Sequence, residues 1–99
     1  MIQKQTAKKP PTRAMGPQIP AQYDAASAGA IQALIAGTAS SHQQQLAIRW
    51  IIEQAAGTYE FQYYPSERDT AFALGRAFVG QQVVKLSKIN TMTLRRDEQ

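Results

Sequence analysis

The chain lacks cysteine altogether and has a single histidine, His42, among its 99 residues. Without cysteine, neither a disulfide framework nor a thiolate metal site can stabilise the fold. A single histidine also excludes multi-histidine chemistry and most of the metal sites found in enzymes. We therefore expect a protein with no metal site and no cofactor.

Long apolar runs are missing as well. No segment approaches the roughly 20 apolar residues of a membrane-spanning helix, and the first residues lack the apolar segment of a signal peptide. We therefore expect a soluble, intracellular product. A length of 99 residues suits one small domain with little to spare.

Catalytic motifs are scarce. His42 lies beside Ser40 and Ser41, but no nucleophile elbow marks either serine as a nucleophile. Gly75 and Gly80 have the spacing of a phosphate-binding loop, yet no Lys-Ser or Lys-Thr pair follows them, and they fall in the middle of an expected helix. The sequence therefore predicts no catalytic residue, and we do not expect an enzyme.

Positive charge is concentrated in the first 23 residues, which hold four of the eleven cationic side chains and no acid. The remaining seven cations balance the seven acids, so the net charge of +4 belongs to this first segment. Four of the five prolines also lie there, and proline excludes both helix and central strand. We predict an extended, basic, Pro-rich arm over residues 1–23, mobile in isolation. Its cations, which would meet an acidic partner or DNA, are Lys4, Lys8, Lys9 and Arg13.

Two shorter helices are expected after the arm. The first has Asp24 as its N-cap and continues to about Ala36 through a run rich in alanine. The second begins after Ser41, which has capping-box spacing with a glutamine three residues later, and Gly57 ends it. Trp50 is expected to anchor this second helix against a third, longer helix.

The longer helix is predicted over residues 66–90. Ser66 precedes Asp69 by three residues and can accept hydrogen bonds from the first turn. Two glycines inside this helix, Gly75 and Gly80, indicate that another segment approaches the backbone, since each weakens a helix by about 1 kcal/mol relative to alanine. For Gly75 we favour helix packing within the domain. Apolar residues recur at intervals of three and four and form one stripe: Phe72, Gly75, Val79, Val83 and Leu86.

The segment between the second and third helices alternates aromatic and polar residues, with Tyr59, Phe61 and Tyr63 at every second position. Such alternation is typical of a half-buried strand, which would have to pair with another copy because the rest of the domain is helical. We favour an extended connector, in which the three aromatic side chains form a docking strip. Arg68 and Arg76, in the helix that follows, are expected to neutralise acids rather than to contact DNA. Those acids are Glu53, Glu67 and Asp69.

These elements predict an all-α fold: a helical hairpin that includes the long C-terminal helix, an additional N-terminal helix, and the extended basic, Pro-rich arm. The arm covers residues 1–23, the helical domain residues 24–90, and a polar tail that should fray residues 91–99. A wide apolar stripe, small residues and an aromatic connector suit self-assembly or docking. The expected protein interface consists of Trp50, Tyr59, Phe61, Tyr63, Phe72, Gly75, Val79 and Gly80.

Two runs of the sequence resemble a family of small structural proteins of tailed phages, typified by a minor virion protein of a Bordetella phage. They are W-I-I-E-Q-A-A-G-T-Y and, after the aromatic connector, T-A-F-A-L-G-R-A-F-V-G-Q-Q-V. An arginine that the family often places two residues after a glycine stands here at Arg76, directly after Gly75. The resemblance covers roughly residues 45–86 and implies a virion component without enzymatic activity. The matching residues are Trp50, Gly57, Tyr59, Thr70, Ala71, Phe72, Gly75 and Gly80.

We therefore expect a minor virion structural or assembly protein of a tailed phage, made in the host cytoplasm and located in the virion. It would pack in multiple copies around the portal, the tail or the internal core, as a homo-oligomer and with other virion proteins, without a membrane. The alternative is a small DNA-binding protein that acts in genome packaging or regulation through its basic arm, and non-specific contact with packaged DNA fits either function. An arm that packs against its own helices would count against the assembly function.

Overall fold

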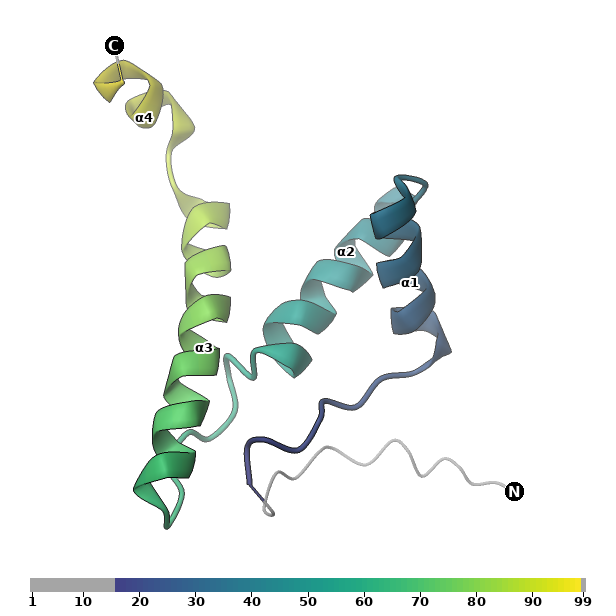
Figure 1. Ribbon diagram of the computed structural model, residues 1–99. Coiled ribbons are helices and arrows are strands. Elements are labelled where there is room, and N and C mark those ends of the chain that lie inside the picture. Colours follow the sequence, from purple (N-terminus) through teal and green to yellow (C-terminus); the bar gives the residue numbers. More distant parts are fainter. Residues whose placement is uncertain (1–15, 99) are drawn as a thin grey trace.

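The computed structural model describes residues 16–98, which form helices and, within that range, no strand (Figure 1). The predicted all-α class is confirmed. One element, η2, is a π-helix that directly continues the second α-helix. In chain order the elements are α1 (Ala25–Ala36), α2 (Ser41–Trp50), η2 (Ile51–Ala55), α3 (Glu67–Lys88) and α4 (Thr91–Asp97).

Local capping explains where α1 begins and ends. The Asp24 carboxylate accepts a hydrogen bond from the Ser27 amide at 2.8 Å, and the Ser27 hydroxyl accepts one from the Asp24 amide at 3.1 Å. This reciprocal pair is a capping box. At the other end Gly37 adopts φ +78°, the left-handed conformation that closes many helices. Both predicted ends of this helix are confirmed.

The second helix has a different cap from the predicted one. The capping box is formed by Ser40 and Gln43, one residue before the predicted pair that begins at Ser41. Two serines in a row are each followed by a glutamine at the third position, so the pattern alone could not distinguish them. Helix α2 then widens into η2, where the Ala56 amide donates to the Ile51 carbonyl oxygen at 2.9 Å.

The long helix α3 has the predicted N-cap, since the Ser66 hydroxyl accepts from the Asp69 amide at 3.4 Å. It ends at Lys88. The sequence predicts a fraying tail after this helix, and this prediction is wrong because the chain forms the short helix α4 there. Asn90 caps α4: its side-chain oxygen accepts from the amides of Met92 and Thr93 at 2.9 and 3.3 Å.

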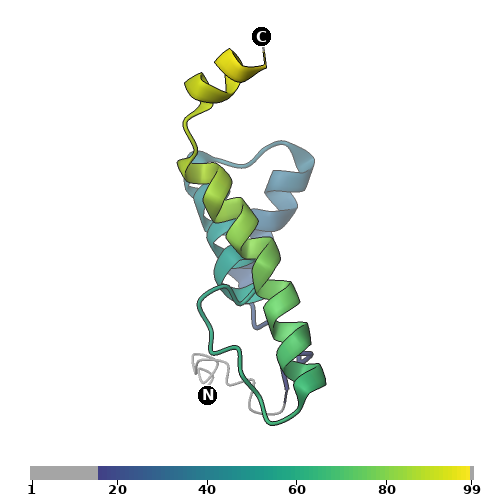
Figure 2. The same cartoon turned by 90° about the vertical axis from the view of Figure 1, so that its left-hand side faces the viewer.

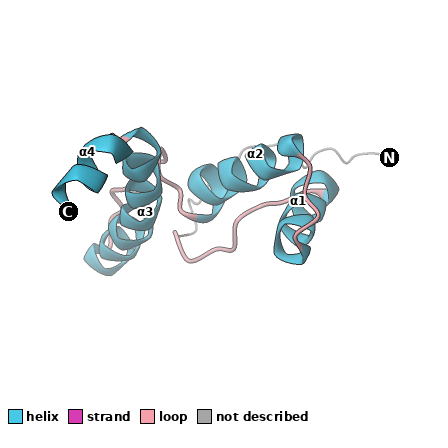
Figure 3. Cartoon of the chain, turned by 90° about the horizontal axis from the view of Figure 1, so that it is seen from above, coloured by secondary structure: helices cyan, strands magenta, loops and turns pink. Residues whose placement is uncertain are grey.

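Helices α1 and α2 run side by side in opposite directions and form the closest helix pair among the described residues (Figure 1). Helix α3 packs against η2 and, within residues 16–98, not against α1 or α2. Figure 2 shows α3 in front of the other two helices, and from above α2 lies between α1 and α3 (Figure 3). The prediction that Trp50 joins α2 to the long helix is therefore wrong. Its indole donates instead to the carbonyl oxygen of Gln22, before α1, at 2.8 Å.

The interior is built from small side chains. Within residues 16–98 the buried aliphatic side chains are those of five alanines and of Pro17, which is the largest fully buried one. The molecule is open and thin, with a Cα radius of gyration of 16.5 Å and a shortest dimension of 17 Å. A compact domain of this length would have a radius of gyration of about 13 Å. Most large apolar side chains therefore remain outside. The buried alanines are Ala30, Ala47, Ala56, Ala73 and Ala77.

Candidate functional site

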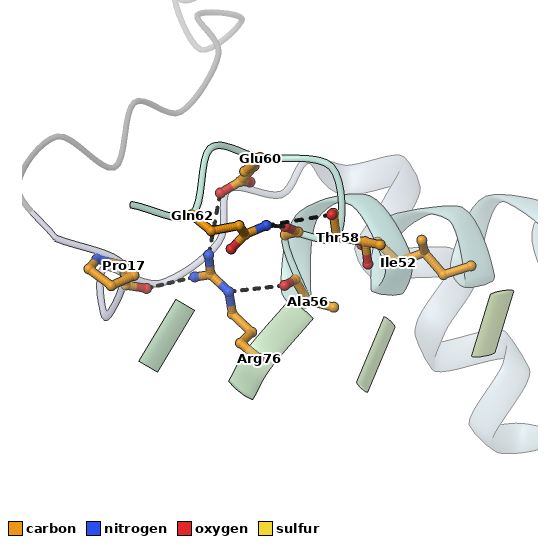
Figure 4. Close-up of polar contacts among 8 residues, drawn as sticks. Pro17, Ile52, Ala56, Thr58, Glu60, Gln62 and Arg76 are labelled. Carbon is orange, nitrogen blue, oxygen red and sulfur yellow. Dashed lines mark hydrogen bonds and ion pairs between the residues drawn. The ribbon is translucent and has the colours of Figure 1, made fainter. Parts of the chain in front are cut away.

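Arg76 of α3 connects three segments of the chain (Figure 4). Its side chain is only 12% exposed, and its Nη1 donates to the carbonyl oxygen of Pro17 at 2.7 Å. Its Nε donates to the carbonyl oxygen of Ala56 at 3.0 Å, and its Nη2 lies 3.5 Å from a carboxylate oxygen of Glu60. A guanidinium that is largely removed from water needs such acceptors. Arg76 therefore holds the segment before α1, the end of η2 and the connector against α3.

The position of the Arg76 guanidinium also explains why residue 57 is a glycine. This glycine has φ +59°, and a Cβ built on it would lie 2.7 Å from Arg76 Nη2. The ring of Phe72 lies beside the same guanidinium, with its centroid 5.9 Å from Cζ. The sequence predicts that Arg76 neutralises an acid rather than contacting DNA; it does pair with an acid, but with Glu60 and not with the predicted Glu53, Glu67 or Asp69. Position 76 falls on the same side of α3 as the buried Ala73 and Ala77, so its side chain is directed inward.

Gly80 is the glycine at which another segment approaches α3. It is buried, and a Cβ built on it would collide with the side chain of Thr58 and lie 2.9 Å from the Cβ of Ala56. Around Gly75, by contrast, no other segment of the described chain comes within 4 Å of such a Cβ. The prediction of a close approach within the domain is therefore confirmed for Gly80 and wrong for Gly75, which lies on the open side of α3.

Hydrogen bonds from short side chains fix both ends of the connector, residues 58–65. The Thr70 hydroxyl accepts from the Tyr64 amide at 2.8 Å and donates to the Tyr64 carbonyl oxygen at 3.2 Å. The Thr58 hydroxyl donates to the Ile52 carbonyl oxygen at 2.7 Å. The connector forms no strand, which favours the connector interpretation over the strand, but it begins with a turn in which the Glu60 amide donates to the Gly57 carbonyl oxygen at 3.1 Å.

The three connector aromatics point away from the helices. Tyr59, Phe61 and Tyr63 are 69%, 75% and 65% exposed. The alternate residues Glu60 and Gln62 are half-buried, because Glu60 faces the guanidinium of α3 and the Gln62 side-chain amide donates to a backbone carbonyl oxygen at 3.0 Å. The rings of Phe61 and Tyr63 meet edge to face, with centroids 6.0 Å apart. These three residues form an outward-facing surface, which we call the aromatic strip.

A second apolar surface lies on α3, opposite the buried Ala73 and Ala77. Its large side chains are exposed; Phe78 and Val79, for example, are each 58% exposed. The intervals of three, four and seven residues between its members place them on one side of the helix. We call this surface the outer face of α3. It consists of Phe72, Leu74, Gly75, Phe78, Val79 and Leu86.

The structure separates the predicted interface residues into two groups. Phe72, Gly75 and Val79 lie together on the outer face of α3, and the connector aromatics form the aromatic strip. Trp50 and Gly80 instead take part in contacts within the chain. Trp50 is half-buried and bonds to the segment before α1, and Gly80 is covered by the start of the connector.

The last part of the predicted arm, residues 16–23, is attached to the helices. Pro17 is buried and accepts the hydrogen bond from Arg76. Gln22 accepts the one from Trp50. The helical body therefore includes residues of the predicted arm, and this attachment counts against an assembly function. The cations of the predicted arm lie outside the described residues; they are Lys4, Lys8, Lys9 and Arg13.

Sequence reasoning missed the inward role of Arg76, although a signal for it was present. Ala73, Ala77 and Gly80 are small residues at helical spacing, which marks the side of a helix that another backbone approaches closely. Arg76 lies on that side, three residues after Ala73 and four before Gly80.

Few side chains in the part of the chain that the structure describes are of the types used in catalysis or metal binding. His42 is exposed in the first turn of α2. Residues 16–98 contain no cluster of three or more His, Cys, Asp or Glu side chains that could hold a metal ion. Within the same range, no helix has both the length and the apolar character to cross a bilayer. No known protein family, characterised protein or solved structure matches the chain.

Proposed function

We propose that this chain is a minor structural protein of a tailed phage particle, which packs in several copies and against other virion proteins around the portal, the tail or the internal core. The observation that carries the proposal is the distribution of apolar side chains, with alanines inside and large residues outside. Monomeric soluble proteins rarely expose extended apolar surfaces, and such surfaces mark contacts with other molecules. A subunit that fills contacts between larger proteins needs this distribution.

The energy available from such contacts is large for a chain of this size. Large apolar side chains are exposed on α1, α2, the connector, α3 and α4 alike. Burying one of them completely contributes about 1.5–3 kcal/mol, whereas a small domain is stable by only about 5–15 kcal/mol. A partner that covers a few of these side chains would therefore stabilise the chain substantially.

The residues that carry the resemblance to phage structural proteins support the proposal through their contacts. Gly57 leaves space for the guanidinium of α3, Thr70 bonds to the connector backbone, and Gly80 receives the connector's first residue. All three hold the connector against α3. The matching residues thus direct the aromatic strip outward, which is what a docking protein requires.

The proposal is tested by following the chain into particles. In virions purified on a density gradient and washed with high salt, we expect the chain to remain at a constant ratio to the major virion proteins. Apolar contacts are not weakened by salt, whereas loose ionic attachment is. A chain that is present in the lysate and absent from the washed particles would contradict the proposal.

The rival DNA-binding function makes a different prediction. It requires a gel shift whose affinity falls steeply with salt and disappears when residues 1–15 are deleted. The deletion should stop there, because Pro17 is bonded to Arg76 and a longer deletion would disturb the helices. Salt-sensitive DNA binding without particle association would favour the rival function.

A further inference from the structure

The outer face of α3 is an apolar surface that no other helix covers in the described part of the chain. Figure 2 is viewed from the side of α3 opposite α1 and α2. The buried side of the helix, with Ala73 and Ala77, is turned toward η2. Helix α3 has 22 residues, which corresponds to about 33 Å. The outer face, from Phe72 to Leu86, spans about 21 Å of that length, which is long enough for a helix–helix contact.

Four residues of the outer face fall into two pairs whose midpoints lie half a residue apart. Phe72 and Val79 are centred between positions 75 and 76, and Leu74 with Phe78 is centred on position 76. When two identical helices pack antiparallel around a two-fold axis, each residue meets the residue at the same distance on the other side of the axis. With the axis beside positions 75 and 76, Phe72 of each copy meets Val79 of the other. Leu74 likewise meets Phe78.

Charged residues at the two ends of α3 share the midpoint of Leu74 and Phe78. Glu67 in the first turn and Lys85 in the last turn are centred on position 76, and both are exposed. They are eighteen positions apart, about five helical turns, so they project from the same side of the helix. In an antiparallel pair, Glu67 of each copy therefore meets Lys85 of the other. A parallel pair would bring like charges together.

Gly75 lies within one residue of these midpoints, on the outer face of α3. A glycine weakens the middle of a helix, and the fold of the single chain does not explain this one, because a Cβ built there meets nothing within 4 Å. At the crossing point of two helices, a residue without a side chain lets the two backbones approach closely. The fold of one chain does not explain why position 75 is a glycine, whereas close packing against a second copy of the chain does.

We propose that two copies of this chain pair antiparallel through the outer faces of α3, with a two-fold axis beside Gly75. The pairing deepens the assembly function proposed above and rests on it. Its crossing angle is shallow, about 20°, because only then do the helix ends stay close enough for Glu67 to reach Lys85 of the second copy.

Cysteine cross-linking tests the register, because the natural chain contains no cysteine. Two full-length variants, Glu67→Cys and Lys85→Cys, are treated with a short thiol-reactive cross-linker, separately and as a mixture. We expect the mixture to form a cross-linked heterodimer and each variant alone to stay largely monomeric. Gln81→Cys is the control, since this residue is exposed on α3 but lies outside the outer face.

Sedimentation velocity of the full-length chain tests the pairing itself. Phe78→Glu should abolish the dimer and leave the helical circular dichroism unchanged, since Phe78 is exposed. Glu67→Lys should weaken the association constant about five- to tenfold, and the added change Lys85→Glu should restore it. Glu53→Lys, an exposed position on η2, is the control and should have no effect.

Two results would overturn the proposal. One is a chain that stays monomeric at about 100 µM, where even a small helix–helix interface should pair. The other is a pair of cysteine variants that each cross-link to themselves and not to each other, which indicates a parallel arrangement. Particle association decides the virion function separately: a monomer found in virions refutes only the pairing, and a dimer absent from virions refutes only the virion function.

Discussion

Arg76 and Pro17 lie 59 residues apart in the sequence and are joined by a hydrogen bond of 2.7 Å from the guanidinium to the carbonyl oxygen. Arg76 also donates to Ala56, which follows η2. One side chain of α3 therefore fixes both the segment before α1 and the exit from η2. Since few large side chains are buried, these polar contacts supply part of the cohesion that a larger apolar core would provide.

Replacing Arg76 with alanine should strongly destabilise the chain. The change removes a charged donor from the carbonyl oxygens of Pro17 and Ala56 and removes the ion pair with Glu60. A hydrogen bond to a charged group contributes about 1.5–3 kcal/mol. We therefore expect the free energy of unfolding to fall by about 2–4 kcal/mol, measured by urea denaturation with circular dichroism.

Two further variants separate the geometry of Arg76 from its charge. Arg76→Lys keeps the charge but cannot reach acceptors in three directions, so we expect it to recover less than half of the lost stability. Arg49→Ala is the control, because Arg49 is exposed on α2, and it should change the free energy of unfolding by less than about 0.5 kcal/mol. Equal stability of Arg76→Ala and Arg49→Ala would contradict the role of Arg76.

Gly80 and Gly75 should respond in opposite directions to the same substitution. In Gly80→Ala the new methyl group meets Thr58, which cannot rotate away without losing its hydrogen bond to Ile52. Overpacking costs about 1–3 kcal/mol, more than the gain of about 1 kcal/mol in helix propensity. Gly75→Ala enters open space and should stabilise the monomer by about 0.5–1 kcal/mol.

Thermal unfolding of both glycine variants, at concentrations too low for self-association, checks this difference. The two positions share a helix and a substitution, so each variant is the control for the other. A rise in melting temperature for both variants would show that the connector does not press against Gly80.

Trp50 is the only tryptophan and reports on the attachment of residues 16–23. Its indole donates to the Gln22 carbonyl oxygen at 2.8 Å. Deletion of residues 1–15 should leave the fluorescence emission of Trp50 unchanged, whereas deletion of residues 1–23 should shift it to longer wavelength, because the indole then faces water. Identical emission from both deletions would argue against this attachment.

Both ends of α1 and the start of α3 could be predicted from the sequence because capping is local. Asp24 and Ser66 each accept a hydrogen bond from an amide three residues later, and Gly37 needs only its own backbone conformation. The pairing of the helices could not be predicted in this way. The small side chains that allow α1 and α2 to approach make no distinctive pattern in an alanine-rich sequence.

The residues of the candidate site could be predicted, but not which way they face. Periodicity shows that Phe72 and Val79 share one side of a helix, and it does not tell whether that side meets the same chain or another molecule. In α3 the side that faces the rest of the chain is the one with Ala73 and Ala77. Their small side chains let the neighbouring segments come close enough for Arg76 to reach its acceptors. The alternation of aromatic and polar residues in the connector likewise does not tell whether the aromatic side chains meet the same chain or another molecule.

The aromatic strip should matter for incorporation into particles and little for folding. Replacing Tyr59, Phe61 and Tyr63 together with serine removes exposed rings, and within the chain it removes the edge contact between Phe61 and Tyr63. That contact contributes about 0.5–1.5 kcal/mol, so the free energy of unfolding should fall by no more than this. Incorporation should fall at least about tenfold, because buried aromatic residues dominate protein interfaces.

Mass spectrometry of purified particles, with peptide signals normalised to the major virion proteins, measures this incorporation. Ile35→Ser is the matched control: Ile35 is 81% exposed on α1 but belongs neither to the aromatic strip nor to the outer face of α3. The control should enter particles normally. If the triple variant entered them as well as the control, the contact with the particle would have to involve a surface other than the connector, and the outer face of α3 would be the next one to alter.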